Sequence, residues 1–242
     1  MRIVSLVPSW TEYLVDLDLS DALIGRTKFC VRAGKKSESA TVIGGTKNIQ
    51  IDRIRKLKPD LIIASKEEND KESVEQCSHF AEVLLTDVRT VEDAFNACIE
   101  IGKATGKTKK SSILVDQIRS AWGEPKIAKS KGCYVVWKSP LMLAGPDTFI
   151  HSVMQWWGIE NTASNLQHGR YPSLTPQQWI EMSSGHVLLP SEPFPFGTKH
   201  LPQFQEQGKQ ALLVDGEAFS WYGSRMLHVA AYLEQLQTEL LN

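Results

Sequence analysis

The feature that most constrains the fold is a stretch of about thirty residues, 91–122, that has the apolar spacing of helices and little strand character. It contains no proline, and only Thr105-Gly106 interrupts it, which predicts two helices over 91–104 and 107–122. Strand-rich sequence lies on both sides of it. A helical stretch this long between two strand-rich halves indicates a connector rather than one more layer of a single sheet.

Each half contains short apolar strands that alternate with helical segments. The run Leu61–Ala64 is apolar at every position, which suits a parallel sheet covered on both faces. The run Val187–Leu189 has the same character in the second half, and both runs lead into a loop with serine and glutamate, at Ser65 and Ser191. This weak repeat of architecture predicts an α/β protein with two similar lobes, whose strand-end loops face a shared cleft.

The chain begins directly with a strand, over Arg2 to Val7, that ends at Pro8. Ser9 and Glu12 then have the spacing of a capping box, which predicts a helix that starts just past the strand's carboxyl end. Open α/β sheets bind their ligands at such a place. No basic segment, apolar stretch and cleavage site come before the strand, so we expect a cytoplasmic protein or one whose export signal has been removed.

Bulk composition excludes several classes of protein. The net charge of −1 gives no electrostatic footprint for nucleic acid, and no apolar run is long enough to span a bilayer. The cysteines Cys30, Cys77, Cys98 and Cys133 form no Cys-x-x-Cys pair, so a zinc site is not expected. Although four cysteines could form two disulfides, we favour reduced cysteines that pack as small apolar residues, with only Cys30 in a loop.

No motif in the sequence proposes catalysis. The segment 102–108 resembles a phosphate-binding loop, but it has three residues instead of four before its Gly-Lys pair and follows a helix instead of a strand. We interpret it as a helix C-cap. No Gly-x-Ser-x-Gly elbow is present, and Glu67-Glu68 is most simply a solvated loop. We therefore expect a protein that is not an enzyme.

Aromatic residues are the best clue to function. The chain has seven tryptophans, and the four at positions 122, 156, 157 and 179 follow helical patterns typical of a core. Other aromatic residues fall at strand ends, helix starts or loops, where flat rings suit a flat, partly apolar ligand. For each ring alone, packing is the simpler explanation, whereas the whole set favours a pocket. The set is Trp10, Phe29, Trp137, Tyr171, Phe194, Phe196, Trp221 and Tyr222.

Several segments resemble the class III periplasmic binding proteins of ABC importers, also called helical-backbone metal receptors, and in particular their vitamin B12-binding members. The matching segments, in chain order, are Val4-Ser5-Leu6-Val7-Pro8-Ser9-x-Thr11-Glu12, Val42-Ile43-Gly44-Gly45, Ile54-x-x-Leu57-Lys58-Pro59-Asp60-Leu61-Ile62 and Trp157-Gly158-x-x-Asn161. Arg170-Tyr171-Pro172 and the run 215–225 resemble the cobalamin-binding subset. The resemblance covers essentially the whole chain.

This resemblance implies an α/β fold with two Rossmann-like lobes of mainly parallel sheet joined by one long connecting helix. The expected segments are an N-terminal lobe over 1–104, the connecting helix over 105–124 and a C-terminal lobe over 125–242. The family's ligands are cobalamin, haem, ferric siderophores and bare metal ions, bound between the lobes by strand-end loops with little hinge bending. The family also implies a periplasmic or cell-envelope location.

Carried over by position, the family's ligand-binding residues form a defined set in this chain. They are Ser9, Trp10, Phe29, Cys30, Gly45, Thr46, Glu68, Trp137, Tyr171, Glu192, Phe194, Trp221 and Tyr222. Family members that bind bare metal use histidines and carboxylates from both lobes. The matching loops here offer no convincing histidine, so the resemblance favours cobalamin or another metal chelate as ligand, with no metal site and no intrinsic cofactor.

The resemblance also implies partners. Family members dock on a transporter permease through an acidic residue on each lobe, and Glu72 and Glu181 lie near the matching places. We expect a monomer. An alternative on the same fold is a cytosolic protein or enzyme that handles corrinoids or other chelates, and a third is an interaction module whose cleft is filled by its own side chains.

Overall fold

The computed structural model describes residues 1–166 and 169–241 and divides the chain into two compact units. Unit 1 comprises Met1–Val88, Glu92–Ser120 and Tyr222–His228. Unit 2 comprises Arg89–Val91, Ala121–Trp221 and Val229–Asn242. Residues 222–228 thus group with unit 1 and not with the expected lobe over 125–242. The expected boundaries near residues 104 and 124 stay a prediction.

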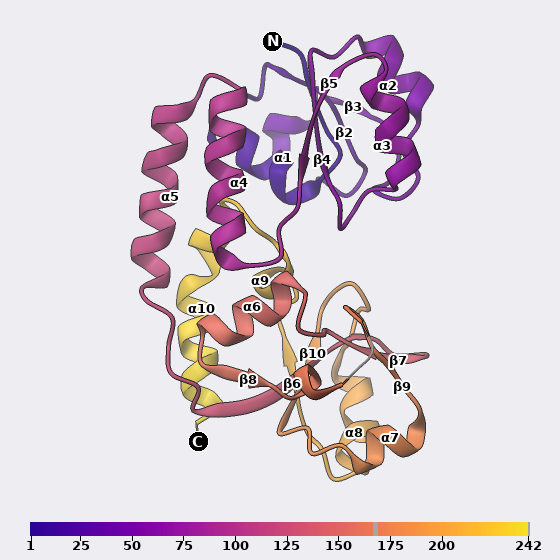
Figure 1. Cartoon of the computed structure of the whole chain (residues 1–242), viewed down its shortest axis with the longest axis vertical. Coiled ribbons are helices and arrows are strands. Elements are labelled where there is room, and N and C mark those ends of the chain that lie inside the picture. The colour runs from indigo at the N-terminus through magenta and orange to yellow at the C-terminus, as the bar shows by residue number, and fades with distance from the viewer. Residues whose placement is uncertain (167–168, 242) are drawn as a thin grey trace. The chain divides into compact units, whose positions relative to one another are not determined.

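Unit 1 is built on a five-stranded parallel sheet of order β3-β2-β1-β4-β5 (Figure 1). The strands are β1 (Ile3–Ser5), β2 (Leu23–Arg26), β3 (Thr41–Val42), β4 (Leu61–Ser65) and β5 (Glu82–Thr86). The helices are α1 (Pro8–Asp16), η1 (Gly34–Ser37), α2 (Ile51–Leu57), α3 (Lys71–Ser78), α4 (Val91–Ala104) and α5 (Thr108–Trp122). Helices α2 and α3 cover one face of the sheet, while α1 and α4 cover the other. This arrangement explains why every residue of β4 is buried, as its apolar run predicts.

Unit 2 is built on a mixed sheet of order β11-β10-β6-β7-β9, with β8 paired to the start of β6. Its strands are β6 (Ser130–Trp137), β7 (Leu141–Leu143), β8 (Ile159–Asn161), β9 (Ser173–Leu174), β10 (His186–Pro190) and β11 (Gln210–Val214). Its helices are α6 (Phe149–Trp156), η2 (Thr162–Asn165), α7 (Pro176–Glu181), η3 (Thr198–His200), α8 (Leu201–Gln205), α9 (Glu217–Ser220) and α10 (Arg225–Glu239), of which residues 225–228 group with unit 1. Strands β8, β6, β10 and β11 are parallel, and only β7 and β9 run against their neighbours. The expected α/β class with two mainly parallel sheets is confirmed.

The helical stretch that opened the sequence analysis folds as predicted. Helix α4 ends at Ala104, and Gly106, with φ +69°, lets the chain turn before α5 begins. The segment that resembles a phosphate-binding loop is therefore a helix C-cap. The chain passes from unit 1 to unit 2 inside α5, after Ser120. Among the described residues, no helix is long and apolar enough to cross a membrane.

The predicted capping box at the start of α1 is wrong. The helix begins at Pro8, and its N-cap, Val7, has no side-chain cap. Proline is suited to the first helical position because its fixed φ is already helical and it lacks an amide that would need a partner. Ser9 therefore lies inside the first turn, and its hydroxyl has no hydrogen-bond partner among the described residues. Glu12 instead pairs with Arg225.

All four cysteines are free and buried, which confirms that they pack as apolar residues. Burial raises the pKa of Cys77 to about 11 and those of Cys98 and Cys133 to about 12, so these thiols stay protonated near neutral pH. Cys30 lies in a loop, as predicted, yet it is 1% exposed and its sulfur contacts the hydroxyls of Thr11 and Thr27.

Candidate functional site

The carboxyl ends of the strands in unit 1 form the first candidate site. The strand order reverses between β1 and β4, and open α/β sheets bind ligands in the crevice outside such a switch point. Four loops follow the strands there, and we call residues 6–9, 27–30, 44–48 and 65–69 the first edge. They carry six of the predicted ligand-binding residues, Ser9, Phe29, Cys30, Gly45, Thr46 and Glu68, and a seventh, Trp10, directly follows the first loop.

Asn69 joins three parts of the first edge through its side-chain amide. Its Oδ1 accepts a hydrogen bond from the Ser65 amide at 2.9 Å. Its Nδ2 donates to the carbonyl oxygens of Leu6 at 3.1 Å and Thr46 at 3.0 Å. Asn69 is 5% exposed, and these bonds satisfy the polar atoms that its burial removes from water. The sequence analysis did not identify this residue.

Tyr222 is the predicted residue that reaches the first edge from far along the chain. Its hydroxyl lies 3.1 Å from Ser65 Oγ and 3.2 Å from Glu68 Oε1, and its ring centroid lies 4.5 Å from that of Trp10. Burial, and secondly the charge of Glu68, raise the pKa of Tyr222 well above its usual range. Tyr222 is therefore a neutral hydrogen-bonding group that holds Glu68 at the edge.

Trp10, Ser9 and Cys30 lie inside unit 1. Trp10 is fully buried, its Nε1 donates to Thr86 Oγ1 at 3.0 Å, and its ring contacts Tyr13 in an edge-on arrangement. Ser9 and Cys30 are 3% and 1% exposed. A ligand could reach these three residues only if the side chains that cover them moved. Their contact with a ligand stays a prediction.

Phe29, Gly45 and Thr46 form the accessible part of the first edge. Phe29 is 50% exposed, and the Lys28 ammonium lies 5.0 Å from its ring centroid. A Cβ on Gly45 would come within 3.2 Å of the Phe29 ring, so glycine allows the close approach of loops 27–30 and 44–48. An exposed ring beside a cation suits a flat ligand.

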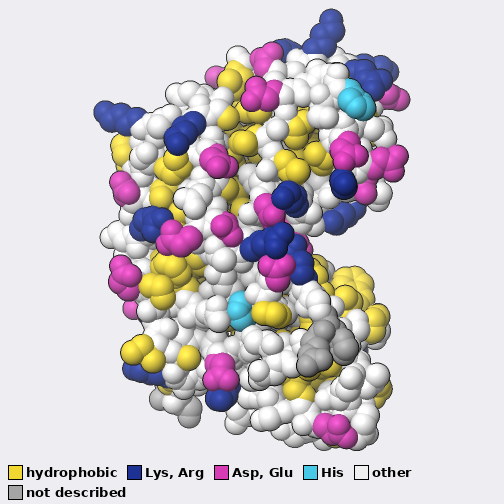
Figure 2. Space-filling model, viewed as in Figure 1, with side chains coloured by type: hydrophobic (Ala, Val, Ile, Leu, Met, Phe, Trp, Pro, Cys, Tyr) yellow, Lys and Arg dark blue, Asp and Glu magenta, His cyan; other side chains and the backbone are white. Residues whose placement is uncertain are grey.

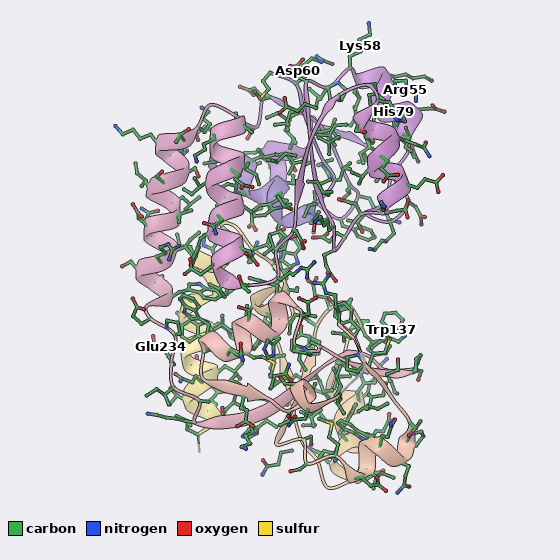
Figure 3. The ribbon with its side chains drawn as sticks, in the orientation of Figure 1. Arg55, Lys58, Asp60, His79, Trp137 and Glu234 are labelled. Carbon is green, nitrogen blue, oxygen red and sulfur yellow. The ribbon has the colours of Figure 1, made fainter. Side chains whose placement is uncertain are left out.

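The carboxyl ends of the strands in unit 2 form the second candidate site. We call residues 137–141, 191–196 and 215–221 the second edge. Trp137, the last residue of β6, is 43% exposed, and its Nε1 donates to the Ser139 carbonyl oxygen at 3.1 Å (Figure 3). Phe194 packs against it edge-on at 5.4 Å between centroids, and Phe196 packs behind Phe194 at 4.6 Å. Apolar side chains gather on the same part of the unit 2 surface (Figure 2).

Glu192 and Trp221 bind each other at the second edge. Glu192 Oε1 accepts hydrogen bonds from Trp221 Nε1 at 2.7 Å and from Ser220 Oγ at 3.0 Å. Burial raises the pKa of Glu192 above its usual value, while these two donors partly offset the effect. A Cβ on Gly216 would come within 2.7 Å of Glu192, so the loops fit closely. Both side chains keep partial exposure.

The remaining predicted residues lie apart from these clusters. Tyr171 is half-buried in a loop whose neighbour, Arg170, donates to the Asp147 carbonyl oxygen at 2.6 Å. Glu72, in the first turn of α3, and Glu181, at the end of α7, are both exposed. Exposed carboxylates are available to a partner, but docking through them stays a prediction.

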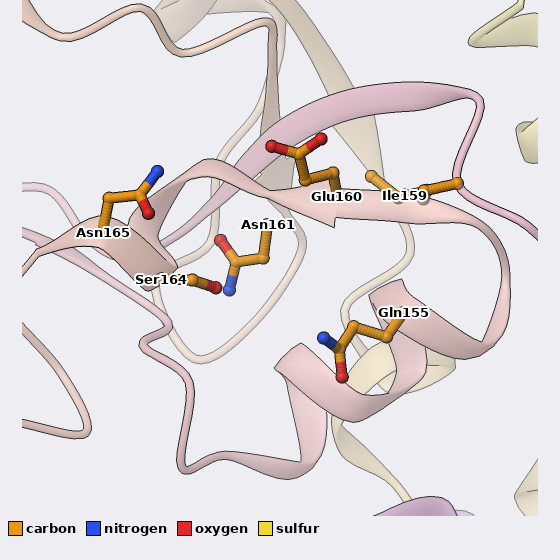
Figure 4. Close-up of a pocket in the computed structure, with 7 residues that line it drawn as sticks. Gln155, Ile159, Glu160, Asn161, Ser164 and Asn165 are labelled. Carbon is orange, nitrogen blue, oxygen red and sulfur yellow. The ribbon is translucent and has the colours of Figure 1, made fainter.

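Two open pockets, both in unit 2, contain none of the predicted residues. The first, of about 410 Å³, lies in unit 2 between α6, β8 and η2, and Gln155, Glu160, Ser164 and Asn165 line it (Figure 4). The second, of about 390 Å³, lies beside β11 and the end of α10. Within the described residues, no three histidine, cysteine or acidic side chains group as metal ligands do. The prediction of no metal site is not tested by this observation.

Comparison with known proteins gives a family match over most of the chain. The model of the periplasmic binding protein family matches residues 3–206. An uncharacterized ABC transporter substrate-binding lipoprotein of Bacillus subtilis is 26% identical over 202 residues, which are 77% of this chain and 60% of that protein. The chain thus spans about 60% of the length of this curated relative. The vitamin B12-binding protein of Pectobacterium carotovorum is 21% identical over 239 residues, covering 95% of this chain and 85% of that protein.

Solved structures share the fold across the whole chain. The periplasmic vitamin B12-binding protein of Vibrio cholerae has a TM-score of 0.79 at 15% identity, covering 99% of this chain and 97% of that one. A periplasmic haem-binding protein from Roseiflexus has a TM-score of 0.81 at 15% identity, with the same coverage. At these identities the similarity establishes the fold and leaves the ligand open.

Proposed function

Because this chain belongs to the periplasmic binding protein family, we propose that it is the substrate-binding component of an ABC importer and carries a metal chelate. Cobalamin, haem and ferric siderophores are the candidate ligands. Relatives with the same fold are named for vitamin B12 and for haem. The chelate is cargo, and the protein performs no chemistry on it and needs no cofactor of its own.

The observation that carries this proposal is the exposed ring of Trp137, which a hydrogen bond and an aromatic contact hold in place. Trp137 is 43% exposed and lies against the partly exposed Phe194. An exposed apolar patch of this kind, unlike a single exposed residue, marks a contact site for a ligand or partner. Its Nε1 bond to Ser139 and the edge-on Phe194 hold the ring in one orientation, so little rotamer freedom is lost when a flat ligand stacks on it. Phe29 supplies a second exposed ring at the first edge.

Polar groups at the two edges supply the directional contacts that a chelate's peripheral groups require. Glu68 and Glu192 are partly exposed carboxylates, each held by a donor from its own unit: Tyr222 holds Glu68, and Trp221 holds Glu192. Groups fixed in this way accept hydrogen bonds from a ligand's amides or hydroxyls without first being ordered. We propose that each carboxylate orients ligand groups that reach its own edge.

The proposed partner is the transporter permease in the cell envelope. Exposed Glu72 on α3 and exposed Glu181 on α7 would pair with basic side chains of the permease. Such rim charges act mainly on the association rate and on its salt dependence. Loss of both carboxylates is therefore expected to slow docking while leaving ligand affinity unchanged.

The test is titration of the whole chain with cyanocobalamin, haemin, a ferric catecholate and a ferric hydroxamate, followed by absorbance and calorimetry. We expect one of these to bind with a Kd in the micromolar range or below and to quench tryptophan fluorescence. Trp137→Ala should weaken that binding at least about ten-fold, which is about 1.4 kcal/mol. Ile180→Ala, which removes another exposed apolar side chain of unit 2, is the matched control. Absence of binding by all four compounds would overturn the proposal.

A further inference from the structure

We infer that Asn69 is the positioning residue of the first edge, fixing its loops before any ligand arrives. The expected effect of Asn69 on ligand affinity rests on the proposed function. Its expected effect on the loops rests on the geometry alone. Asn69 is 5% exposed, so its side chain offers almost no surface to a ligand. It therefore acts through the residues that it holds.

The chemistry of the three bonds requires an asparagine. The Ser65 amide needs an acceptor, which Oδ1 supplies at 2.9 Å, and the carbonyl oxygens of Leu6 and Thr46 need donors, which Nδ2 supplies at 3.1 and 3.0 Å. Only a side-chain amide combines one acceptor with two donors in one plane. An aspartate has nearly the same shape but, when ionised, would turn acceptor oxygen toward two carbonyl oxygens.

Each bond reaches a different part of the edge. Leu6 directly follows β1, and the Ser65 bond fixes the start of the loop whose Glu68 contacts Tyr222. Thr46 lies in the turn whose Gly45 packs against the exposed ring of Phe29. Asn69 thus links the switch point to both the carboxylate and the ring that the proposed function uses.

A second bond spans two of the same loops on the outside. Lys47 Nζ donates to the Glu67 carbonyl oxygen at 2.7 Å, but the bond is exposed to water. Exposed bonds contribute less than buried ones because water competes for both partners. Backbone bonds from Lys28 to Gly44 and from Gly45 to Asn48 also hold turn 44–48. The buried amide of Asn69 is the side-chain group that ties this turn to loops 6–9 and 65–69, and Lys47 adds an exposed bond.

A matched control exists in unit 2. Asn161 is 3% exposed, its Nδ2 donates to the Ala144 carbonyl oxygen at 2.9 Å and lies 3.1 Å from His151 Nδ1, and its Oδ1 accepts from the Ala163 amide at 3.0 Å. It has the same chemistry and burial as Asn69 but joins no loop of either edge. Asn69→Asp and Asn161→Asp should therefore lower the unfolding temperature by similar amounts while differing in their effect on the ligand site.

The first measurement is ligand affinity, using whichever of the four chelates the unmodified chain binds. Asn69→Asp should weaken binding at least about ten-fold, which is about 1.4 kcal/mol, and Asn161→Asp less than about two-fold. Equal losses in the two variants would show that Asn69 acts only through global stability. That result would overturn the inference.

The second measurement is amide hydrogen exchange of the unliganded chain, which needs no ligand. Asn69→Asp should speed exchange in residues 44–48 and 65–69 but not in α2, and Asn161→Asp should leave all three segments unchanged. Unchanged exchange in both loops would overturn the inference. If no chelate binds, the proposed function fails, and this measurement still decides the role of Asn69. If Asn69→Asp does not fold, Asn69→Ser with Asn161→Ser takes its place.

Discussion

Trp10 in unit 1 and Trp137 in unit 2 both lie near the carboxyl end of a central strand, but Trp10 is fully buried and Trp137 is 43% exposed. Trp10 follows β1 on helix α1, which packs on the sheet and places the ring in the interior against Tyr222, with its Nε1 bonded to Thr86. Trp137 is the last residue of β6, which is buried on both faces from Gly132 to Val136, and it is exposed because the strand ends there.

The difference shows that a position at a strand end does not decide whether an aromatic side chain is buried or exposed. In unit 1 the ends of the strands are fixed by buried hydrogen bonds from Asn69 and Tyr222. In unit 2 the surface at the end of β6 is built from aromatic rings stacked behind Trp137. The two edges therefore differ in composition: the first has mainly polar groups fixed by hydrogen bonds, and the second has mainly aromatic side chains.

The largest expected effect tests this contrast directly. Trp10→Ala should lower the free energy of unfolding by about 3–5 kcal/mol because it empties a buried site. Trp137→Ala should change it by no more than about 0.5 kcal/mol because half the ring is already in water. Urea unfolding of both variants measures the difference. Similar losses of stability would abolish the distinction between the two tryptophans.

The next prediction compares the loss of stability when one ion pair in each unit is broken. Glu12 and Arg225 form a largely buried pair, with side chains 10% and 15% exposed, so Arg225→Ala should cost about 3 kcal/mol. Lys131 and Glu160 form an exposed pair in unit 2, at 65% and 48%, so Lys131→Ala should cost no more than about 0.5 kcal/mol. Urea unfolding at pH 7 gives both values.

The Arg225→Ala variant should also acquire a pH dependence. Burial raises the pKa of Glu12 above 4.5 even beside Arg225, and removal of the cation raises it further. A carboxyl whose folded pKa lies above its unfolded value binds protons more readily in the folded state. The cost of the substitution is therefore smallest below pH 4.5 and grows as pH rises through the folded pKa. A cost that is constant from pH 4 to 7 would contradict this account.

A smaller effect tests the close fit of loops at the second edge. Gly216→Ala should cost about 1–3 kcal/mol because the new Cβ would overlap Glu192, which must then leave Ser220 and Trp221. Gly197→Ala is the control, since no atom lies within 4 Å of its Cβ position. Thermal unfolding compares the variants, and chelate titration shows whether the displaced Glu192 weakens binding. A neutral Gly216→Ala would mean that this edge is not tightly packed.

The smallest effect concerns His151 in unit 2. Burial lowers its pKa below 6.5, so the unfolded chain takes up a proton before the folded chain does. Its contribution to stability is complete above pH 6.5 and is lost as pH falls through the window below that value. His151→Gln should therefore flatten the stability profile between pH 7.5 and 5.5. An unchanged slope would show that other groups set the acid sensitivity.

Much of the fold could be predicted from the sequence because its signals are local. The apolar run of β4 and the helical spacing of the stretch 91–122 are both short-range signals, and both elements are present. The start of α1 was misplaced because a Ser-x-x-Glu pattern looks the same whether its serine caps a helix or lies inside it. Pro8 decided the start, and Glu12 took a partner more than two hundred residues away.

The candidate site was less predictable because its key contacts are not local. Asn69 gave a signal in the sequence, an amide residue directly after a strand-end loop, where such side chains bind backbone groups. The sequence could not identify its partners, Leu6 and Thr46, since they lie on separate loops. Nor could it show that Trp221 would bind Glu192.

The sequence alone determined the class of this protein: short apolar strands, alternating helices and a long helical stretch specify an α/β chain with two mainly parallel sheets. These features follow from backbone periodicity and the burial of apolar side chains, which act over a few residues. Only the tertiary structure decided which strand-end residues are buried and which are accessible. That depends on the direction in which each element packs, so Trp10 became interior and Trp137 remained at the surface.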